Sequence, residues 1–282
     1  MKDKLYVNLG CGSRYHSDWI NFDIVSGSPQ VIGHDLRRGI PLADNSCDVA
    51  YHSHMIEHLR PAEAINLMEE CFRILKPGGV VRVALPDLER ICRCYLEKLE
   101  SAVNNDETAS DDYDWMMLEL YDQTVREQPG GAMRGFLKRT PLPNASFIYE
   151  RIGEEARAII DPPVTVTDAK SKTLRRFSNS LHYRFGRLLE GFSKIILRLK
   201  GGDQSRALEI GTFRLAGEVH QWMYDRYSLA RLMTDVGFQK PTQRSATDSA
   251  IPGWASFNLD TLLDGTVVKP DSLFMEATKP GG

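Results

Sequence analysis

Leu5-Tyr6-Val7-Asn8-Leu9-Gly10-Cys11-Gly12 is the stretch that decides the fold, because an apolar run passes directly into two closely spaced glycines. The run predicts a buried strand, and the glycines predict a tight turn at its end. Since Gly10 and Gly12 carry no side chain, the backbone there can approach a ligand closely. The stretch therefore predicts a strand with a ligand site at its carboxyl end.

Four more apolar runs, each bounded by Gly, Pro, Asn or Asp, predict further strands at 19–24, 31–36, 48–53 and 80–85. Residues 61–75 lie between the last two and place apolar side chains at helical spacing, which predicts a right-handed parallel crossover. The connections between the first three strands are too short for such a crossover, so we expect their helices to be short or missing. An α/β sheet is the predicted core.

The chain from 97 to 217 is helical in pattern, charged and interrupted by Pro and Gly, so we expect it to form a helical insertion. The core then comprises residues 1–96 and resumes over 218–282. In that last part, a helix near 227–236, a weak strand near Thr242 and a final strand over 272–278 are predicted. The chain thus returns to the sheet with its own C-terminal segment.

Charge is segregated within the insertion. Residues 100–119 hold seven acids and no base, whereas residues 170–200 hold nine bases and one acid, Glu190. Apolar residues three and four positions apart run from Leu174 to Leu199, which predicts a basic amphipathic helix. Such a helix could make weak contact with an anionic membrane surface, or could pack internally so that its bases neutralise the acidic stretch.

The composition of the 282 residues is that of a globular protein, with 42% hydrophobic and 26% charged residues and a net charge of −3. This charge argues against nucleic acid as the main partner.

No apolar run reaches the roughly 18 residues of a membrane-spanning helix, and Met1 to Lys4 are charged where a signal peptide is apolar, so we expect a cytoplasmic protein. The five cysteines form neither a disulfide framework nor a metal-binding pair, so we expect reduced thiols and predict no metal.

Two carboxylates follow predicted strands at the edge where the first strand ends. Asp23 can accept hydrogen bonds from both hydroxyls of a ribose, and Asp35 can accept one from the amine of an adenine, with Leu36 beside the ring. A dinucleotide fingerprint would have a third glycine where Tyr15 stands, which argues against NAD. No Lys-Ser or Lys-Thr follows the turn, which argues against ATP. The pattern predicts a nucleoside site.

Further motifs occur together in the order and spacing of one enzyme family. They are Val7-Asn8-Leu9-Gly10-Cys11-Gly12, Asp23, His34-Asp35-Leu36, Asp44-Asn45-Ser46-Cys47-Asp48, Glu57-His58-Leu59 and Arg73-Ile74-Leu75-Lys76-Pro77-Gly78-Gly79. The set resembles the core of the class I S-adenosylmethionine-dependent methyltransferases. The resemblance implies a Rossmann-like sheet, mostly parallel with an antiparallel last strand, and S-adenosyl-L-methionine as the cofactor.

The same resemblance implies which residues meet the cofactor. The methionine part would lie over the glycine turn, the ribose on Asp23 and the adenine near Asp35, while His52 to His54 would border the cofactor and face the substrate. The implied cofactor-binding residues are Asn8, Leu9, Gly10, Cys11, Gly12, Asp23, Ile24, Asp35, Leu36, His52 and Ser53. Because only four residues precede the first predicted strand, we expect the insertion to cover this site and to build the acceptor pocket.

A narrower resemblance concerns the short connections, Trp222-Met223-Tyr224-Asp225 and Ser272-Leu273-Phe274-Met275-Glu276-Ala277. These features resemble predicted methyltransferases associated with bacterial surface-polysaccharide functions. The likeness implies O-methylation of a saccharide or glycan precursor, by analogy of fold alone. Three alternatives stay open: a methyltransferase of another small metabolite, a nucleic-acid methyltransferase, and a partner protein that binds the cofactor without catalysis.

His220 is the first candidate for a catalytic general base, since imidazole titrates near neutral pH and Glu218 and Trp222 flank it. A purely structural role for His220 is the alternative. His54, after the fourth strand, is the second catalytic candidate. His54 and His58 are four residues apart, so they could share a helix face and bind a metal, or could be a structural pair.

Glu119, Asp122 and Arg126 are spaced so that a helix would align them on one face. They would form either a solvated ion-pair face or an acceptor-binding edge, on which Gln123 and Arg126 hydrogen-bond sugar hydroxyls. Together with Trp222, Gln123 and Arg126 are the predicted substrate-binding residues.

Overall fold

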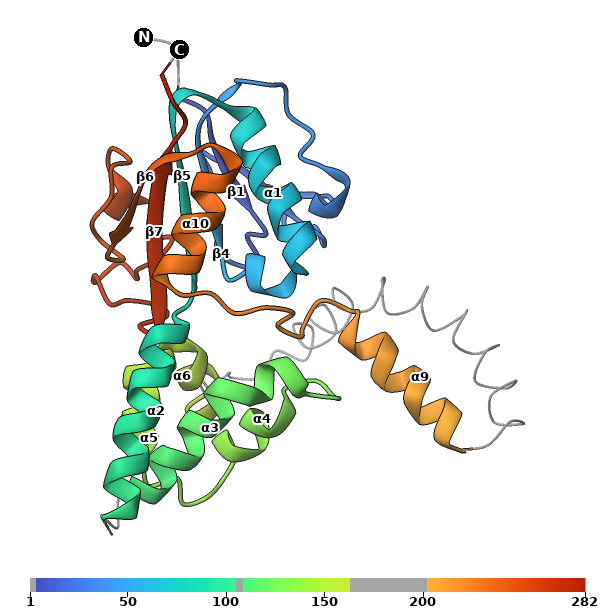
Figure 1. The fold of residues 1–282 in the computed structure, drawn as a ribbon, viewed down its shortest axis with the longest axis vertical. Helices are drawn as coiled ribbons and strands as arrows, with labels where there is room; N and C mark the ends of the chain where they lie inside the picture. Colours follow the sequence, from blue (N-terminus) through green and yellow to red (C-terminus); the bar gives the residue numbers. More distant parts are fainter. Residues whose placement is uncertain (1–3, 105–108, 163–201, 282) are drawn as a thin grey trace.

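The computed structural model describes residues 4–104, 109–162 and 202–281. Seven strands form one sheet in the order β3-β2-β1-β4-β5-β7-β6 (Figure 1). The strands are β1 (Tyr6–Leu9), β2 (Ile20–Asp23), β3 (Val31–Gly33), β4 (Cys47–Ser53), β5 (Leu75–Pro86), β6 (Gln239–Arg244) and β7 (Ser272–Thr278). β7 is antiparallel to both of its neighbours, and all the other pairings are parallel. The structure confirms the predicted Rossmann-like sheet, mostly parallel with an antiparallel last strand.

Helices connect the strands where the sequence leaves room for them. The helices are α1 (Pro61–Ile74), α2 (Leu88–Val103), α3 (Ala109–Val125), α4 (Gly131–Leu137), α5 (Ala145–Ile152), α6 (Glu154–Ile160), α9 (Gly202–Arg214) and α10 (Arg226–Val236), and the short 3-10 helices are η1 (Leu36–Arg38), η2 (Ile56–His58) and η3 (Trp254–Phe257). As predicted, α1 crosses from β4 to β5, and the described residues between β1 and β3 contain no helix. The short connections therefore leave one face of the sheet without helices from this part of the chain.

The two faces of the sheet are covered differently, and the strand residues alternate accordingly. Val7, Leu9 and Ala50 belong to the large core that α1 and α10 share with the sheet. Tyr6, Val49 and Tyr51 point to the other face, where they pack with aromatic side chains. The aromatic cover comes from Trp19, Trp254 and Phe257, so the segment that follows β6 takes the place of a helix layer.

A buried arginine fastens this C-terminal cover to the sheet. Arg82 on β5 is fully buried, and its guanidinium lies 2.8 Å from the carboxylate of Asp260 and 2.7 Å from that of Glu276. The same guanidinium lies over the ring of Trp254, 4.3 Å from its centroid. The Tyr51 hydroxyl donates a 2.6 Å hydrogen bond to Asp260. One cation thus pairs with two buried carboxylates from different segments, and Arg244 also pairs with Glu276, at 3.3 Å.

Helices α2 to α6 form a separate layer at one end of the sheet (Figure 1). This layer has its own core, which includes Trp115, Phe136 and Ile148. Its first helix, α2, begins at Leu88, ahead of the predicted start of the insertion, because Asp87 accepts hydrogen bonds from two backbone amides of the first turn. The predicted basic helix within 170–200 lies outside the described residues.

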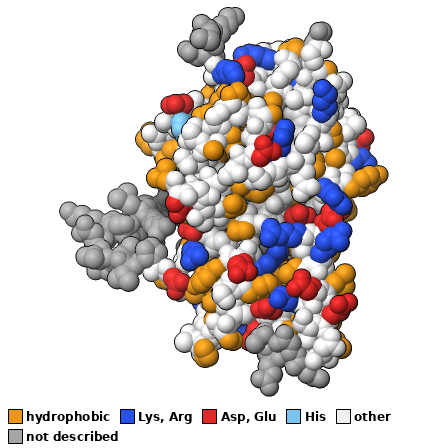
Figure 2. All heavy atoms as spheres, turned by 90° about the vertical axis from the view of Figure 1, so that its left-hand side faces the viewer, with side chains coloured by type: hydrophobic (Ala, Val, Ile, Leu, Met, Phe, Trp, Pro, Cys, Tyr) orange, Lys and Arg blue, Asp and Glu red, His pale blue; other side chains and the backbone are white. Residues whose placement is uncertain are grey.

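Two surface features bear on the partners of the protein. On the face shown in Figure 2, Lys and Arg side chains are interspersed with Asp and Glu, so neither sign of charge dominates that face. Each helix in the described part of the chain is too short or too polar to cross a lipid bilayer.

Candidate active site

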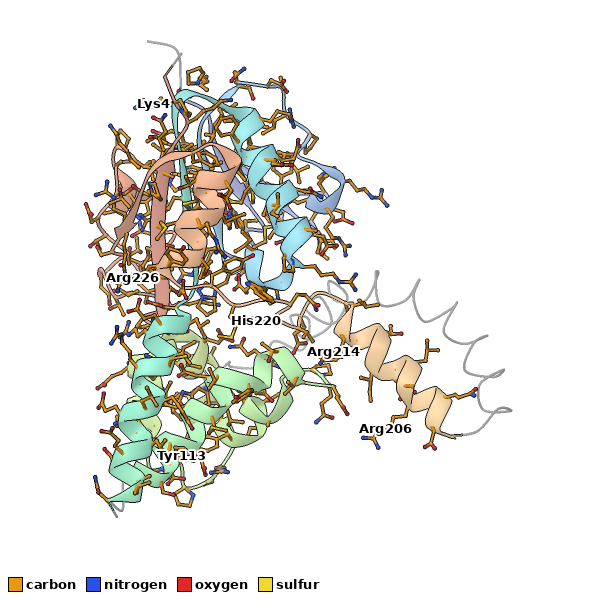
Figure 3. The ribbon with its side chains drawn as sticks, viewed as in Figure 1. Lys4, Tyr113, Arg206, Arg214, His220 and Arg226 are labelled. Atoms are coloured by element: carbon orange, nitrogen blue, oxygen red, sulfur yellow. The ribbon has the colours of Figure 1, made fainter. Side chains whose placement is uncertain are left out.

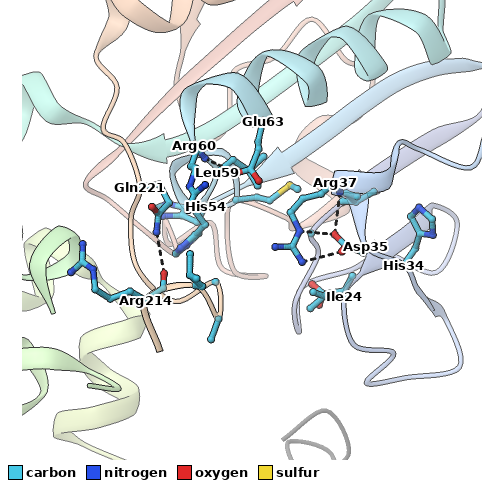
Figure 4. A pocket seen from close by; sticks show the side chains of 18 residues that line it. Ile24, His34, Asp35, Arg37, His54, Leu59, Arg60, Glu63, Arg214 and Gln221 are labelled. Carbon is cyan, nitrogen blue, oxygen red and sulfur yellow. Dashed lines mark hydrogen bonds and ion pairs between the residues drawn. The ribbon is translucent and has the colours of Figure 1, made fainter. Parts of the chain in front are cut away.

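A cavity of about 540 Å³ opens at the carboxyl ends of β1, β2, β3 and β4. This is the edge where ligands bind in open α/β sheets, beside the point at which the strand order reverses. Figure 4 shows Ile24, Asp35 and Arg37 on one side of the cavity and His54, Arg60 and Gln221 on the other. Its size lies within the usual range for small-molecule sites, about 300–1,000 Å³.

The glycine turn after β1 forms part of the wall. Gly10 and Gly12 have φ angles of +68° and +54°, which residues with a side chain rarely adopt. A Cβ atom at Gly10 would lie 2.8 Å from Cγ of Met55, which also lines the cavity. Glycine at this position is therefore needed both for the turn and for the close approach of the loop after β4.

Asp23, at the end of β2, lines the cavity and is held by the backbone around it. Its carboxylate accepts hydrogen bonds from the amides of Gly12, at 2.7 Å, and Val25, at 3.2 Å. Each carboxylate oxygen can accept more than one hydrogen bond. Asp23 therefore keeps acceptor capacity for the hydroxyl groups of a ligand while it ties the glycine turn to β2.

Asp35, after β3, also lines the cavity but already has a charged partner. Both of its carboxylate oxygens lie 2.9 Å from nitrogens of the Arg37 guanidinium, and the backbone amide of Arg37 donates to it as well. The hydrogen bonds from Arg37 hold the pKa of Asp35 below its usual value. An adenine amine would have to share the Asp35 carboxylate with Arg37 or displace the Arg37 guanidinium.

The structure brings five predicted cofactor-binding residues together in the cavity wall, and these are Gly10, Asp23, Ile24, Asp35 and Leu36. The other predicted cofactor-binding residues do not line the cavity. The side chains of Asn8, Leu9, Cys11 and His52 are buried, so they would act on a ligand only through their backbone or through the residues they support. Gly12 and Ser53 neighbour wall residues without lining the cavity themselves.

Cys11 and Asn8 have structural partners. The Sγ atom of Cys11 donates to the carbonyl oxygen of Gly12, and burial raises the pKa of the thiol to about 11. The amide of Asn8 donates to the carbonyl oxygen of Arg14 at 3.0 Å. Both side chains therefore stabilise the conformation of the turn.

His52 on β4 is completely buried, and among the described residues neither of its ring nitrogens has a hydrogen-bond partner. Burial disfavours the charged ring and lowers the pKa of His52 to about 4, although the negative charge of Glu57 offsets part of this effect. His52 is therefore neutral near pH 7.

We expect His52 to make the protein sensitive to acid. Unfolded chains protonate histidine near pH 6.5 and the folded chain protonates His52 only near pH 4, so stability present above pH 6.5 is lost as the pH falls towards 4. The shift corresponds to roughly 3 kcal/mol at most. Urea unfolding near pH 7.5 and pH 4.5 should show a larger loss for the wild type than for His52→Gln, and equal losses would contradict this assignment.

Glu57 and His58, which follow β4, meet His220 beside the cavity. His220 lies at the junction between the sheet and the helical layer (Figure 3). His54 and His58 line the cavity, and Nδ1 of His54 lies 3.3 Å from Oε1 of the buried Glu57. The rings of His58 and His220 contact each other edge to face, with their centroids 4.7 Å apart. His58 and His220 are far apart in the sequence, and the fold brings them together.

This cluster has unusual electrostatics. Burial would raise the pKa of Glu57, but the adjacent His54 ring, whose Nδ1 lies 3.3 Å from Oε1, holds it well below its usual value, so the carboxylate is ionised. Burial lowers the pKa of His220 to about 3. A ring with so low a pKa is neutral near pH 7, and the general-base role of His220 stays a prediction.

The predicted acceptor-binding residues lie outside the main cavity. Gln123 and Arg126 line a second cavity of about 420 Å³ in the helical layer. Arg126 is engaged in ion pairs with Asp122, at 2.8 Å, and Glu218, at 3.1 Å. The side chain of Trp222 is 51% exposed and lines neither of these two cavities.

Several wall residues were not predicted from the sequence. Met55, Arg60 and Glu63 follow β4, where any loop of this fold borders the ligand, so their position in the chain could have indicated them. Arg214, Leu215, Ala216, Gly217 and Gln221 carry no such signal. The stretch from Arg214 to Gly217 is the C-terminal end of the predicted insertion, so this end of it contributes to the wall.

Comparisons with known proteins point to the same part of the chain. A family model described as a methyltransferase domain matches residues 24–83. A protein of Mycolicibacterium smegmatis named as a probable S-adenosylmethionine-dependent methyltransferase is 42% identical over 101 residues, which cover 29% of this chain and 37% of that protein. The similarity thus spans well under half of either protein. A methyltransferase domain matches this region, and S-adenosyl-L-methionine is the cofactor that such a domain implies.

Two solved structures align over almost the whole chain. A methyltransferase from Archaeoglobus fulgidus is 11% identical with a TM-score of 0.39, and the alignment covers 99% of this chain and 87% of that one. The complex of the Haloferax volcanii Trm112 activator with a methyltransferase aligns with 11% identity and a TM-score of 0.37, over 100% and 86% of the two chains. TM-scores this low do not establish a shared fold. The fold assignment rests on the order of the strands in the sheet.

Proposed function

We propose that this chain is an S-adenosylmethionine-dependent methyltransferase that methylates an oxygen of a saccharide or glycan precursor. The observation that carries the proposal is the cavity at the carboxyl ends of β1 to β4, where Gly10, Asp23 and Asp35 meet. The match of residues 24–83 to a methyltransferase domain supports methyl transfer, and the saccharide acceptor is the part that we propose beyond it.

The residues of the cavity fit a nucleoside that carries an amino-acid chain. Gly10 lines the cavity, and any side chain there would collide with Met55, so the glycine turn keeps its backbone available to the methionine part. Asp23 would accept from the ribose hydroxyls, and Ile24 and Leu36 would pack against the adenine. The bound cofactor would supply a methyl group on a positively charged sulfur. The chain would align the acceptor oxygen with it and exclude water.

A polar acceptor suits the wall of the cavity that lies opposite the residues proposed to hold the nucleoside. Arg214 lines that part of the cavity, but its guanidinium donates to the carbonyl oxygens of Thr124 and Arg126. Arg60, Glu63 and Gln221 also line it, and they offer both donors and acceptors to sugar hydroxyls (Figure 4). A largely apolar metabolite would leave these groups unpaired, at a cost in affinity. Gln123, Arg126 and Trp222 would contact the acceptor only if it extended beyond this cavity.

We place the reaction in the cytoplasm. All five cysteines are free, as expected in a reducing compartment. A lipid-linked acceptor would bring the protein to a membrane surface, and the segment 170–200 considered for that contact lies outside the described residues.

The direct test is incubation of the full chain with S-adenosylmethionine labelled in its methyl group. The acceptor panel would contain nucleotide sugars, lipid-linked glycans, apolar small metabolites and bulk RNA. We expect label on a sugar oxygen. Label on an apolar metabolite or on RNA would contradict the proposed acceptor, and no release of S-adenosylhomocysteine with any acceptor would indicate a cofactor-binding protein without this activity.

The Asp35 carboxylate gives a prediction about the adenine end of the site. Asp35→Ala should weaken S-adenosylmethionine binding about tenfold, because a hydrogen bond to a charged acceptor contributes about 1.5 kcal/mol or more. Arg37→Ala should leave the affinity unchanged or raise it, since it frees Asp35 from its ion pair. Calorimetry of both variants separates the two roles, and equal losses would show that the Asp35–Arg37 pair acts only as a structural unit.

A further inference from the structure

In the cluster of Glu57, His58 and His220, the Glu57 side chain is unusual because it is a buried carboxylate. It is 1% exposed, and within the described part of the chain neither carboxylate oxygen has a hydrogen-bond partner. Nδ1 of His58 is likewise buried without a partner there. Burying a charged carboxylate is costly unless another charge or a metal ion compensates it. The ion pair with His54 involves Oε1 and leaves Oε2 uncompensated.

We propose that Glu57, His58 and His220 form a binding site for a divalent metal ion of the zinc type. One ligand atom from each residue lies within 4.8 Å of the other two. Ligands about 2.1 Å from a tetrahedral centre lie about 3.4 Å from one another, so shifts of about 1 Å would close the site. Two imidazoles and one carboxylate form a set that borderline divalent ions favour, and such a set leaves a coordination position open.

The surrounding structure holds these three residues in place. Nδ1 of His54 lies beside Oε1 of Glu57, and its Nε2 lies 2.8 Å from the hydroxyl oxygen of Ser272. The carbonyl oxygen of Glu57 accepts from the amide of Gln221, at 2.7 Å, so the segment that carries His220 is bonded directly to η2. Partners that orient metal ligands in this way are a regular part of metal sites. His54 is therefore a positioning residue in this proposal.

The location of the cluster suggests what the ion would do. His58 belongs both to the cluster and to the cavity wall, so the site adjoins the space assigned to the acceptor. An ion there would bind the acceptor hydroxyl oxygen and lower the pKa of that hydroxyl, whose proton would pass to water. This role rests on the proposed function, whereas the binding of the ion does not.

Metal binding can be measured on the full chain without cofactor or acceptor. After treatment with a chelator, titration with Zn²⁺ should show one bound ion and a raised Tm, and Co²⁺ should give the visible absorption of a site with few ligands. Glu57→Gln and His220→Asn should each weaken Zn²⁺ binding by about tenfold or more, as losses of metal partners do. The matched control is His16→Asn, which should bind like the wild type.

The outcomes separate this proposal from the proposed function. A wild-type chain that binds no Zn²⁺ or Co²⁺, or Glu57→Gln and His220→Asn chains that fold and bind as the wild type does, would overturn the metal site. S-adenosylmethionine affinity, measured on the same variants, should stay near that of the wild type, which shows that they are folded. If the ion binds but no acceptor is methylated, the metal site stands and the methyltransferase assignment fails.

Discussion

Asp23→Ala is expected to lower the affinity for S-adenosylmethionine about 100-fold. Two hydrogen bonds from ribose hydroxyls to a charged carboxylate contribute about 1.5 kcal/mol or more each, and about 1.4 kcal/mol is a factor of ten. The substitution also removes the acceptor for the Gly12 amide, which loosens the turn under the methionine part. Calorimetric titration of the purified variant measures the change.

The matched control is Asp18→Ala, an aspartate of the same loop region whose side chain is 80% exposed. It should bind the cofactor as the wild type does. Asp23→Asn should bind with intermediate affinity, because an amide oxygen still accepts a hydrogen bond but carries no charge. A folded Asp23→Ala variant with unchanged affinity would show that Asp23 is not the ribose partner.

Arg82→Met is expected to lower the free energy of unfolding by about 3–5 kcal/mol, the usual cost of removing one partner from a buried ion pair. The substitution retains most of the side-chain volume but leaves the carboxylate of Asp260 buried without its cation and Glu276 with Arg244 alone. The segment that covers the second face of the sheet would detach first, because Arg82 joins it to β5.

The control for this prediction is Arg93→Met, which removes an arginine whose side chain is 74% exposed and which pairs with Glu89 at 2.8 Å. Exposed pairs contribute about 0–1 kcal/mol, so this variant should unfold at nearly the wild-type urea concentration. Equilibrium unfolding of both variants gives the comparison. Similar, small losses for the two would mean that the Arg82 network does not hold the C-terminal cover.

The sheet was predictable because burial on both faces makes its central strands read as apolar runs. β6 was predicted only as a weak strand near Thr242, and its sequence Gln239–Arg244 is polar because it lies at the exposed edge. The aromatic cover of the second face was not predicted. Ile251, Trp254 and Leu259 are isolated apolar residues without strand or helix periodicity, and their role follows from tertiary packing alone.

More residues of the candidate site could be predicted from the sequence on the cofactor side than on the acceptor side. Gly10, Asp23 and Asp35 follow strand ends, and the topology of the sheet gathers strand ends at one edge. Contacts such as that of His58 with His220 join segments far apart in the chain, and no local pattern encodes them. The spacing of Asp122 and Arg126 left open a solvated ion-pair face or an acceptor-binding edge. The two residues do form an ion pair, but it is buried, and Arg126 faces a second cavity.

The most direct test of the account is a crystal structure of the chain with S-adenosylhomocysteine. We expect the nucleoside in the cavity of about 540 Å³, with its ribose hydroxyls within hydrogen-bond distance of the Asp23 carboxylate and its amino-acid chain over Gly10. Density for the compound elsewhere on the protein, or none in the cavity at saturating concentration, would contradict the central claim.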